Sequence, residues 1–410
     1  MSAQVQSSYW RPRIFPYNGD ISDAEIDRAQ AIDPTGSTNW EKVEEIGRDG
    51  LVGHLKKIPT IGYRLTQYEY GSFEFWRKIT NKSDATTTLT LNDFKTAAFD
   101  IAAYLTDDEG TFLGTLVYSE LRTAGFSINI GSPDAIIERN FDFVGEQFNI
   151  WQGDNKYYIY DTYTCTSGAD NDIDLSSISP AEDPDNPSDY ILRVLRVRGT
   201  VTTELVRGVT YSFEPTTDTL TISAVQTGDI IKSYYTSATA PAAIFTNNDT
   251  DVAGILADSA EIYLYVAGSG NPSSSDYLYK VQSCTLDVRF EREDVKEIGS
   301  AKVVSRSVKD KTVTVTLGKL QDSTFKIEEV LRGVTSGYGR LDITQMSDEA
   351  AVIIKIFSDK SKTNFQYGFL ATTMAPRDIT PGAAVNETVK AGVTLEGEDL
   401  TITTTEGSLV

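Results

Sequence analysis

The stretch from Tyr279 to Gly333 constrains the fold most, because it contains two segments in which apolar and polar residues alternate. In residues 284–290 one face carries Cys284, Leu286, Val288 and Phe290. In residues 311–317 one face carries Val313, Val315 and Leu317, and the other carries three threonines. A period of two is typical of a strand with one buried face. The sequence therefore predicts two half-buried β-strands here.

A long charged segment, residues 291–310, separates these two strands. It is too long and too charged for a tight hairpin turn. Such a segment either stays mobile or reaches a neighbouring subunit, and we expect an arm that makes contacts between subunits. The candidate contact residues are Glu293, Asp294, Lys296, Glu297 and Arg306.

A second informative segment is Phe126–Trp151, which predicts a strand pair. Together with residues 279–333 it resembles the tail tube proteins (major tail proteins) of tailed phages and related contractile injection systems. The resemblance rests on the run REDVKEIG at residues 292–299 and on the order of strand, charged segment, strand and short helix around it. It also rests on a match to the segment "sENFtLVGdn", carried by Glu138, Asn140, Phe141, Phe143, Val144, Gly145 and Glu146. The match covers about half of the chain.

This resemblance implies a fold, partners and a location. In that family six copies form a ring, and stacked rings form a helical tube around a tape-measure protein and the genomic DNA. The expected fold is a mainly β sandwich or barrel with one principal helix. Further partners would be a sheath, a baseplate and tail-terminator proteins. The protein would belong to the virion tail and assemble in the host cytoplasm. Whether the tail contracts, and whether the cargo is DNA or an effector, stays open.

Alternation also selects the residues that would face the channel of such a tube. The lumen candidates are Asp142, Asp287, Glu291, Thr312, Thr314 and Thr316. The formal net charge of −22 and the pI near 4.5 exclude a sequence-reading nucleic-acid binder, which needs a basic surface. The acidity indicates either simple solubility or an acidic lumen that repels passing DNA.

Changes in composition divide the chain into expected domains. Residues 1–48 predict an N-terminal arm, interrupted by three prolines. Residues 49–161 and 242–395 predict a discontinuous tail-tube domain, in which Asn92 would cap the principal helix and Phe94, Ala98, Ile101 and Leu105 recur at helical spacing. Residues 162–241 predict an inserted linker and an outward-facing β module that resembles small immunoglobulin-like domains. Residues 396–410 predict a C-terminal tail.

The inserted module contains a cluster of basic residues in an otherwise acidic chain. Its outer-surface candidates are Arg193, Arg196, Arg198 and Arg207. Two roles remain open for them: ion pairs between neighbouring strands of the module, or binding of an acidic neighbour.

A search for catalytic and metal-binding motifs indicates that the chain is not an enzyme. His54 is the single histidine, so most zinc sites and hydrolase triads have no imidazole to use. The sequence lacks G-x-S-x-G, Walker-A and G-x-G-x-x-G motifs in the right context. Cys165 and Cys284 are too far apart for a C-x-x-C motif, and Cys284 is expected to be buried. We expect no catalytic residue, no cofactor, no metal and, without a long apolar run, no membrane anchor.

Two other protein classes remain possible on sequence grounds. A β-sandwich adhesin or surface-layer protein would explain the inserted module. A carbohydrate-binding β protein would explain the abundant tyrosine and tryptophan. The carbohydrate class predicts a monomer with a glycan cleft, whereas a tube subunit would form rings that stack.

Overall fold

The computed structural model describes most of the chain. The described residues are 10–17, 21–37, 40–44, 51–56, 60–107, 111–145, 147–152, 156–168, 171–175, 180–181, 191–199, 201–237, 254–268, 272–296, 303–320, 326–331, 349–382 and 390–409.

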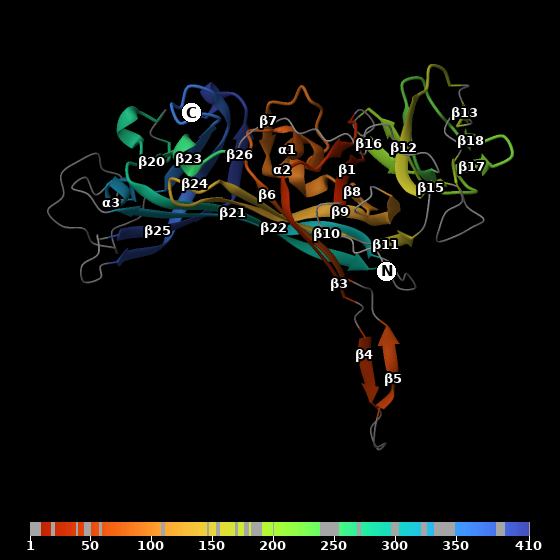
Figure 1. Cartoon of the computed structure of the whole chain (residues 1–410), viewed down its shortest axis with the longest axis horizontal. Coiled ribbons are helices and arrows are strands. Elements are labelled where there is room, and N and C mark those ends of the chain that lie inside the picture. The colour runs from red at the N-terminus through yellow and green to blue at the C-terminus, as the bar shows by residue number, and fades with distance from the viewer. Residues whose placement is uncertain are drawn as a thin grey trace.

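The fold is mainly β, as the sequence predicts, and a large antiparallel sheet dominates it (Figure 1). Its central part contains β3 (Ala29–Ser37), β6 (Thr60–Tyr68), β10 (Glu138–Gly145), β21 (Val281–Lys296), β22 (Val303–Leu320) and β25 (Lys390–Gly397). One end adds β1 (Trp10–Pro16), β2 (Ala24–Glu25), β8 (Phe99–Thr106) and β11 (Gln147–Gln152). The other end adds β7 (Thr88–Thr90), β20 (Ala260–Val266), β23 (Ala350–Phe357) and β26 (Asp399–Thr403).

Two long strands, β9 (Phe112–Ile130) and β24 (Phe365–Gly382), join the three parts. The first half of β9 pairs with β8 and β11, and its second half pairs with β10 and β21. The first half of β24 pairs with β23 and β26, and its second half pairs with β25. Glu120 and Thr373 lie where the partners change, and both have positive φ, 54° and 53°. Such local bends let one strand serve two differently oriented sheets.

The apolar face of the central sheet is covered by two short helices, α1 (Glu74–Ile79) and α2 (Leu91–Thr96) (Figure 1). Trp76 on α1 is fully buried, and its ring lies 5.0 Å from the rings of both Phe126 and Phe141. Phe94 on α2 packs on Phe126 at 5.2 Å. These aromatic contacts hold the helices on the sheet, and a third helix, α3 (Lys326–Leu331), contacts β20.

The predicted principal helix is wrong, and three helices of six residues each stand among the described elements instead. The helix that begins after Thr90 ends at Thr96, and residues 99–106 form β8. This strand is buried on both faces, because Ile101 faces the main core while Ala102 and Tyr104 face a second core. A short strand buried on both sides loses its period of two, so its apolar residues also match a helical spacing.

The two predicted strands around residues 284–317 are confirmed. Cys284, Leu286, Val288, Val313 and Val315 are all buried, as the alternation requires. The expected arm at 291–310 is corrected, however, because β21 and β22 continue as a paired hairpin from Glu291 opposite Asp310 to Lys296 opposite Val303. The charged residues therefore lie on a two-stranded ribbon, in which each strand pairs with the other.

Three expected boundaries also differ from the observed strands. Residues 10–37 do not form a separate arm, since β1 pairs with β8 and β3 pairs with β6. The expected tail after residue 396 contains β26, which lies between β24 and β7. The module begins before residue 162, because its first strand starts at Tyr157. In each case pairing with a distant strand decided the boundary, and local composition does not report such pairing.

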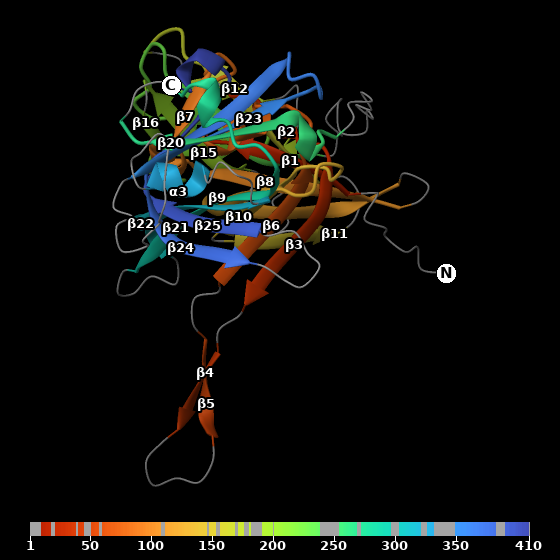
Figure 2. The ribbon, with the colours of Figure 1, turned by 90° about the vertical axis from the view of Figure 1, so that its left-hand side faces the viewer.

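The inserted module consists of two small antiparallel sheets around a core of its own. The first contains β12 (Tyr157–Thr164), β14 (Pro180–Ala181), β15 (Ile191–Arg198), β16 (Val201–Glu204) and β19 (Ile230–Ser237). The second contains β13 (Asp172–Asp174), β17 (Tyr211–Glu214) and β18 (Thr219–Ile222). A further hairpin of β4 (Trp40–Glu44) and β5 (Leu51–Lys56) extends away from the body, as Figure 2 shows. In the described part of the chain no helix is long and apolar enough to cross a membrane.

The core makes a direct stability prediction. We expect Trp76→Ala to lower the free energy of unfolding by about 3–5 kcal/mol, because the cavity would lie between both helices and the sheet. Tyr279→Ala is the matched control, since Tyr279 is 61% exposed and its loss should cost less than about 0.5 kcal/mol. Denaturant unfolding of both variants would measure this. An equal loss of unfolding free energy in Trp76→Ala and Tyr279→Ala would contradict the assignment of Trp76 as the centre of the core.

Candidate functional site

The side of the central sheet opposite α1 and α2 is the candidate functional site, and we call it the polar face. Strand register places its residues in rows that cross the sheet. One row runs through Asp33, Arg64, Asp142, Gly125, Arg289 and Thr312. The next runs through Asn140, Ser127, Asp287, Thr314 and Glu396. Directly paired residues of antiparallel strands share a face, so these side chains form one continuous surface.

The structure brings all six lumen candidates onto this face. Four of them, Asp142, Asp287, Glu291 and Thr312, line one shallow hollow of about 610 Å³. Thr314 and Thr316 lie farther along β22, opposite Glu396 and Thr394 of β25. Asp142 and Asp287, which are 145 positions apart in sequence (287 − 142), thus line the same hollow, because β9 lies between β10 and β21.

The acidic residues of the polar face have basic partners, so the face is not uniformly acidic. Arg64 donates to Asp142 at 2.7 Å, and Arg289 donates to Asp287 at 2.8 Å. Lys309 lies 3.4 Å from Glu291. The hydrogen bond to Asp142 raises the pKa of the Arg64 guanidinium. Exposed pairs of this kind add at most about 1 kcal/mol each, so their main effect is to balance charge on the surface.

The residues expected to contact a neighbouring subunit lie on or beside the hairpin of β21 and β22. Arg306 is buried and donates to Asp294 at 2.8 Å within its own hairpin, so this pair stabilises the ribbon of one chain. Glu293 is exposed. Lys296 is the last residue of β21, and its side chain lies outside the described part, as does all of Glu297.

Arg292 is a functional residue of the hairpin that the sequence analysis missed. It donates to the carbonyl oxygens of Thr123, Phe94 and Lys95 at 2.7–3.1 Å. Burial, followed by the nearby charges of Arg122 and Arg306, lowers its pKa to about 10. Arg292 therefore ties the ribbon to β9 and to the end of α2. Its place in a run of charged residues concealed this role, and no local signal separates it from its neighbours.

The four arginines expected on the outer surface of the module have different environments. Arg198 forms an ion pair with Asp229 at 2.7 Å inside the module, and Arg196 donates to the carbonyl of Ala224. Arg207 is exposed. Arg193 is the exception, because it faces the large sheet and its side chain is only 13% exposed. The expectation of an outer surface is therefore wrong for Arg193.

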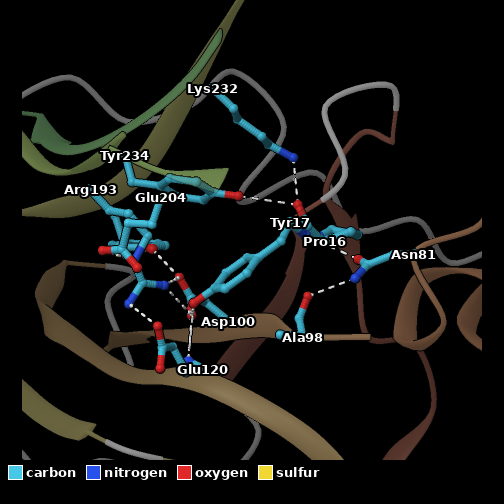
Figure 3. Close-up of polar contacts among 11 residues, drawn as sticks. Pro16, Tyr17, Asn81, Ala98, Asp100, Glu120, Arg193, Glu204, Lys232 and Tyr234 are labelled. Atoms are coloured by element: carbon cyan, nitrogen blue, oxygen red, sulfur yellow. Dashed lines mark hydrogen bonds and ion pairs between the residues drawn. The ribbon is translucent and has the colours of Figure 1, made fainter. Parts of the chain in front are cut away.

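Arg193 belongs to a buried polar cluster between the module and the large sheet (Figure 3). Its guanidinium lies 3.4 Å from Asp100 on β8, 3.3 Å from Glu120 on β9 and 3.4 Å from Glu204 on β16. Asp100 also accepts hydrogen bonds from the hydroxyls of Tyr17 and Tyr158. The module is thus docked through charged as well as aromatic contacts.

Asp100 also accepts a hydrogen bond of 2.8 Å from the backbone N–H of Glu120, the residue at which β9 bends. Burial raises the pKa of the Asp100 carboxyl to about 7, although the hydrogen bonds from Tyr158 and Glu120 favour its charged form. Lys232 on β19 lies nearby, and burial lowers its pKa to about 7. A neutral amine retains two N–H groups, and Lys232 donates to two carbonyl oxygens, those of Pro16 and Ile21.

None of these groups forms a recognisable metal site. Among the described residues, no three His, Cys, Asp or Glu side chains come together in a way that could hold a metal ion. Cys165 and Cys284 are both buried and unpaired with each other.

The chain was compared with known proteins. No protein-family model matches it, and no curated protein matches it. Among solved structures it is similar to a chain of the anti-feeding prophage (AFP) baseplate, determined by cryo-EM with 6-fold symmetrisation. The likeness covers 37% of this chain and 98% of that chain, at 13% sequence identity and a TM-score of 0.27. A TM-score of this size does not establish a shared fold or function.

The buried carboxyl predicts a specific dependence of stability on pH. The folded state binds the Asp100 proton more tightly than the unfolded state, because the pKa is raised from 3.8 to about 7. Its contribution to stability is therefore largest below about pH 4 and declines as the pH rises toward 7. Between these two pKa values the free energy of unfolding should fall by at most about 1.4 kcal/mol per pH unit because of Asp100. Asp100→Asn should remove this slope.

Denaturant unfolding between about pH 4 and pH 6 would measure this pH dependence of the free energy of unfolding. Lys232 stays protonated in the folded and unfolded protein over that range, so it does not contribute. The groups that face Asp100 in both proteins are Tyr17, Tyr158, Glu120, Arg193, Glu204 and Tyr234. Asp172→Asn, at an exposed carboxylate of the module, is the control. Parallel pH curves for the wild type and Asp100→Asn would show that Asp100 does not titrate in this range.

Proposed function

We propose that this chain is a structural subunit of a phage-type tail tube. Copies would associate in hexameric rings, the rings would stack, and the polar face would line the channel. The single observation that carries the proposal is the polar face itself. It collects the lumen candidates on one open surface, while the opposite face is filled by α1 and α2.

The edges of the central sheet support association into rings. In the described part of the chain, β3 pairs only with β6, which leaves its outer edge open. At the other side, residues 375–382 of β24 pair with β25 and with no other described strand. Unpaired edges on opposite sides of one sheet suit a head-to-tail interface between identical subunits. Closing a ring would satisfy both edges, and the polar faces would then form one inner wall.

The balanced charges of the polar face support a passive channel. A wall rich in lysine and arginine would hold the DNA phosphates, and a wall of unpaired carboxylates would resist entry of the DNA. Ion pairs such as Arg64–Asp142 and Arg289–Asp287 present both signs at short spacing. Neutral threonines on β22 continue the wall. Such a surface has little net attraction for a passing duplex.

The remaining parts of the proposal follow from the tube. The lumen would hold a tape-measure protein and then DNA, and the tube would contact a sheath, a baseplate and a tail-terminator protein. The chain would assemble in the host cytoplasm and remain in the virion tail. We propose no catalytic activity, since the polar face carries ion pairs and hydroxyls without a nucleophile–base pair.

Electron microscopy of the purified protein at increasing concentration tests the proposal. We expect rings with sixfold end views, followed by hollow filaments as rings stack. Sedimentation velocity on the same samples would show a discrete oligomer in equilibrium with the subunit. A monomer at every concentration, with no ring on the grids, would contradict a self-assembling tube subunit.

A pair of lysine substitutions tests which face lines the channel. Thr314→Lys together with Thr316→Lys adds two positive charges per subunit to the polar face. Assembled tubes of this variant should retain DNA that a nuclease cannot digest, and the retention should weaken steeply with salt. Thr202→Lys with Thr203→Lys, on exposed strand β16, is the matched control and should bind only nuclease-sensitive DNA. Equal nuclease sensitivity in both would place β22 outside the channel.

A further inference from the structure

The described residues 10–17 and 21–27, here called the N-terminal segment, lie between the large sheet and the inserted module. Strand β1 pairs with β8 over seven residues and with β2 over two. Ile14 points into the core of the large sheet, whereas Phe15 belongs to the second core, which the module completes. The segment is therefore held on two sides by parts of the chain that are far apart in sequence.

Besides Arg193, four side chains of the module contact residues 15–17 and 21–23 directly. The rings of Tyr158 and Tyr160 lie edge-on to Phe15, at 5.1 and 6.0 Å. The hydroxyl of Tyr160 accepts a hydrogen bond from the backbone N–H of Asp23 at 2.9 Å. The other two side chains, Lys232 and Tyr234, both come from β19.

Lys232 makes the most specific of these contacts. Its side chain is fully buried, and its Nζ donates to the carbonyl oxygens of Pro16 at 2.6 Å and Ile21 at 3.1 Å. Tyr234 donates a second hydrogen bond to Pro16, at 3.1 Å (Figure 3). Proline cannot donate a backbone hydrogen bond, so its carbonyl is the only backbone group through which Pro16 itself can form one. Both donors come from the module.

Tyr17 completes the connection to the Asp100 cluster. Its hydroxyl donates to Asp100 at 2.5 Å, its ring lies under the Arg193 guanidinium at 4.9 Å, and its backbone N–H donates to Asn81 at 3.0 Å (Figure 3). Arg193 thus touches the N-terminal segment and the large sheet at the same time.

We propose that the inserted module is a clasp that holds the N-terminal segment on the edge of the large sheet. Opening the clasp would release residues 10–27 as a unit and expose the edge of β8. The module would then have an internal function in each subunit, in addition to any contact it makes outside. This inference does not depend on assembly into a tube.

The physical basis of the clasp is the cost of leaving its buried groups without partners. If the module moved away, the carbonyl of Pro16 would lose the donors Lys232 and Tyr234, and the carbonyl of Ile21 would lose Lys232. Phe15 would lose the module's side chains from its apolar surroundings. Burial of an unsatisfied polar group is unfavourable, so the segment would exchange these contacts for water. Release of the segment is therefore coupled to undocking of the module.

Hydrogen–deuterium exchange of the full chain, read by peptide mass spectrometry, tests the clasp. Lys232→Met keeps the length of the side chain but removes the donor, and exchange in residues 10–27 should become at least about tenfold faster. Tyr234→Phe removes one hydroxyl and should have a smaller effect in the same peptides. Arg198→Met is the matched control, because the hydrogen bonds of the Arg198 guanidinium to described residues go to Asp229 and Ala224, both within the module. It should leave residues 10–27 unchanged.

Peptides from residues 281–317 report on the rest of the sheet and should stay protected in all three variants. Faster exchange confined to the module would overturn the proposal, because the segment would then be held without it. Equal acceleration in residues 10–27 and 281–317 would also overturn it, since the lysine would then support the whole fold. If Lys232→Met does not yield folded protein, the Tyr234→Phe and Arg198→Met pair decides between the same outcomes.

Discussion

The bend of β9 at Glu120 is the constraint on which much of the molecule depends. A single strand of nineteen residues serves two parts of the large sheet, and it can do so only if its direction changes midway. The change places Glu120 in a left-handed conformation, which is unfavourable for a residue with a side chain. Asp100 binds the backbone N–H of that residue and also binds Arg193 of the module. One buried carboxylate therefore fixes the corner of the sheet and the position of the module together.

Charged side chains have different effects in the interior of the molecule and on the polar face. In the interior, Glu69 lies 3.3 Å from Arg139, accepts hydrogen bonds from the backbone N–H groups of Tyr70 and Gly71, and accepts another from the Tyr367 hydroxyl. Removing one member of this set would leave a buried charge without its partner. The set therefore favours one arrangement of β10, β24 and the end of β6. On the polar face, by contrast, exposed pairs add little stability and instead set the charge that a passing molecule meets.

The sequence predicted the central site better than it predicted the surroundings of that site. Alternation along 284–290 and 311–317 identified the buried and polar faces correctly, because one face of these strands meets solvent. It failed for residues 99–106, where both faces are buried and the alternation disappears. It also failed for Arg193 and Arg306, since a charged residue in a charged stretch looks exposed until its partner is known. Arg193 contacts Asp100, which lies 93 residues away in the sequence, and a local sequence pattern does not predict a contact between such distant residues.

By itself, the sequence determined the mainly β class, the half-buried strands of the polar face, the burial of Cys284 and the presence of an inserted β module. These follow from short-range periodicity and composition, which the burial of apolar surface imposes directly on neighbouring residues. Only the tertiary structure decided which strands pair, where β9 and β24 bend, and that the N-terminal segment lies beneath the module. Those features depend on hydrogen bonds and ion pairs between residues far apart in the chain. These hydrogen bonds and ion pairs stabilise the fold only when folding removes both partners from water together.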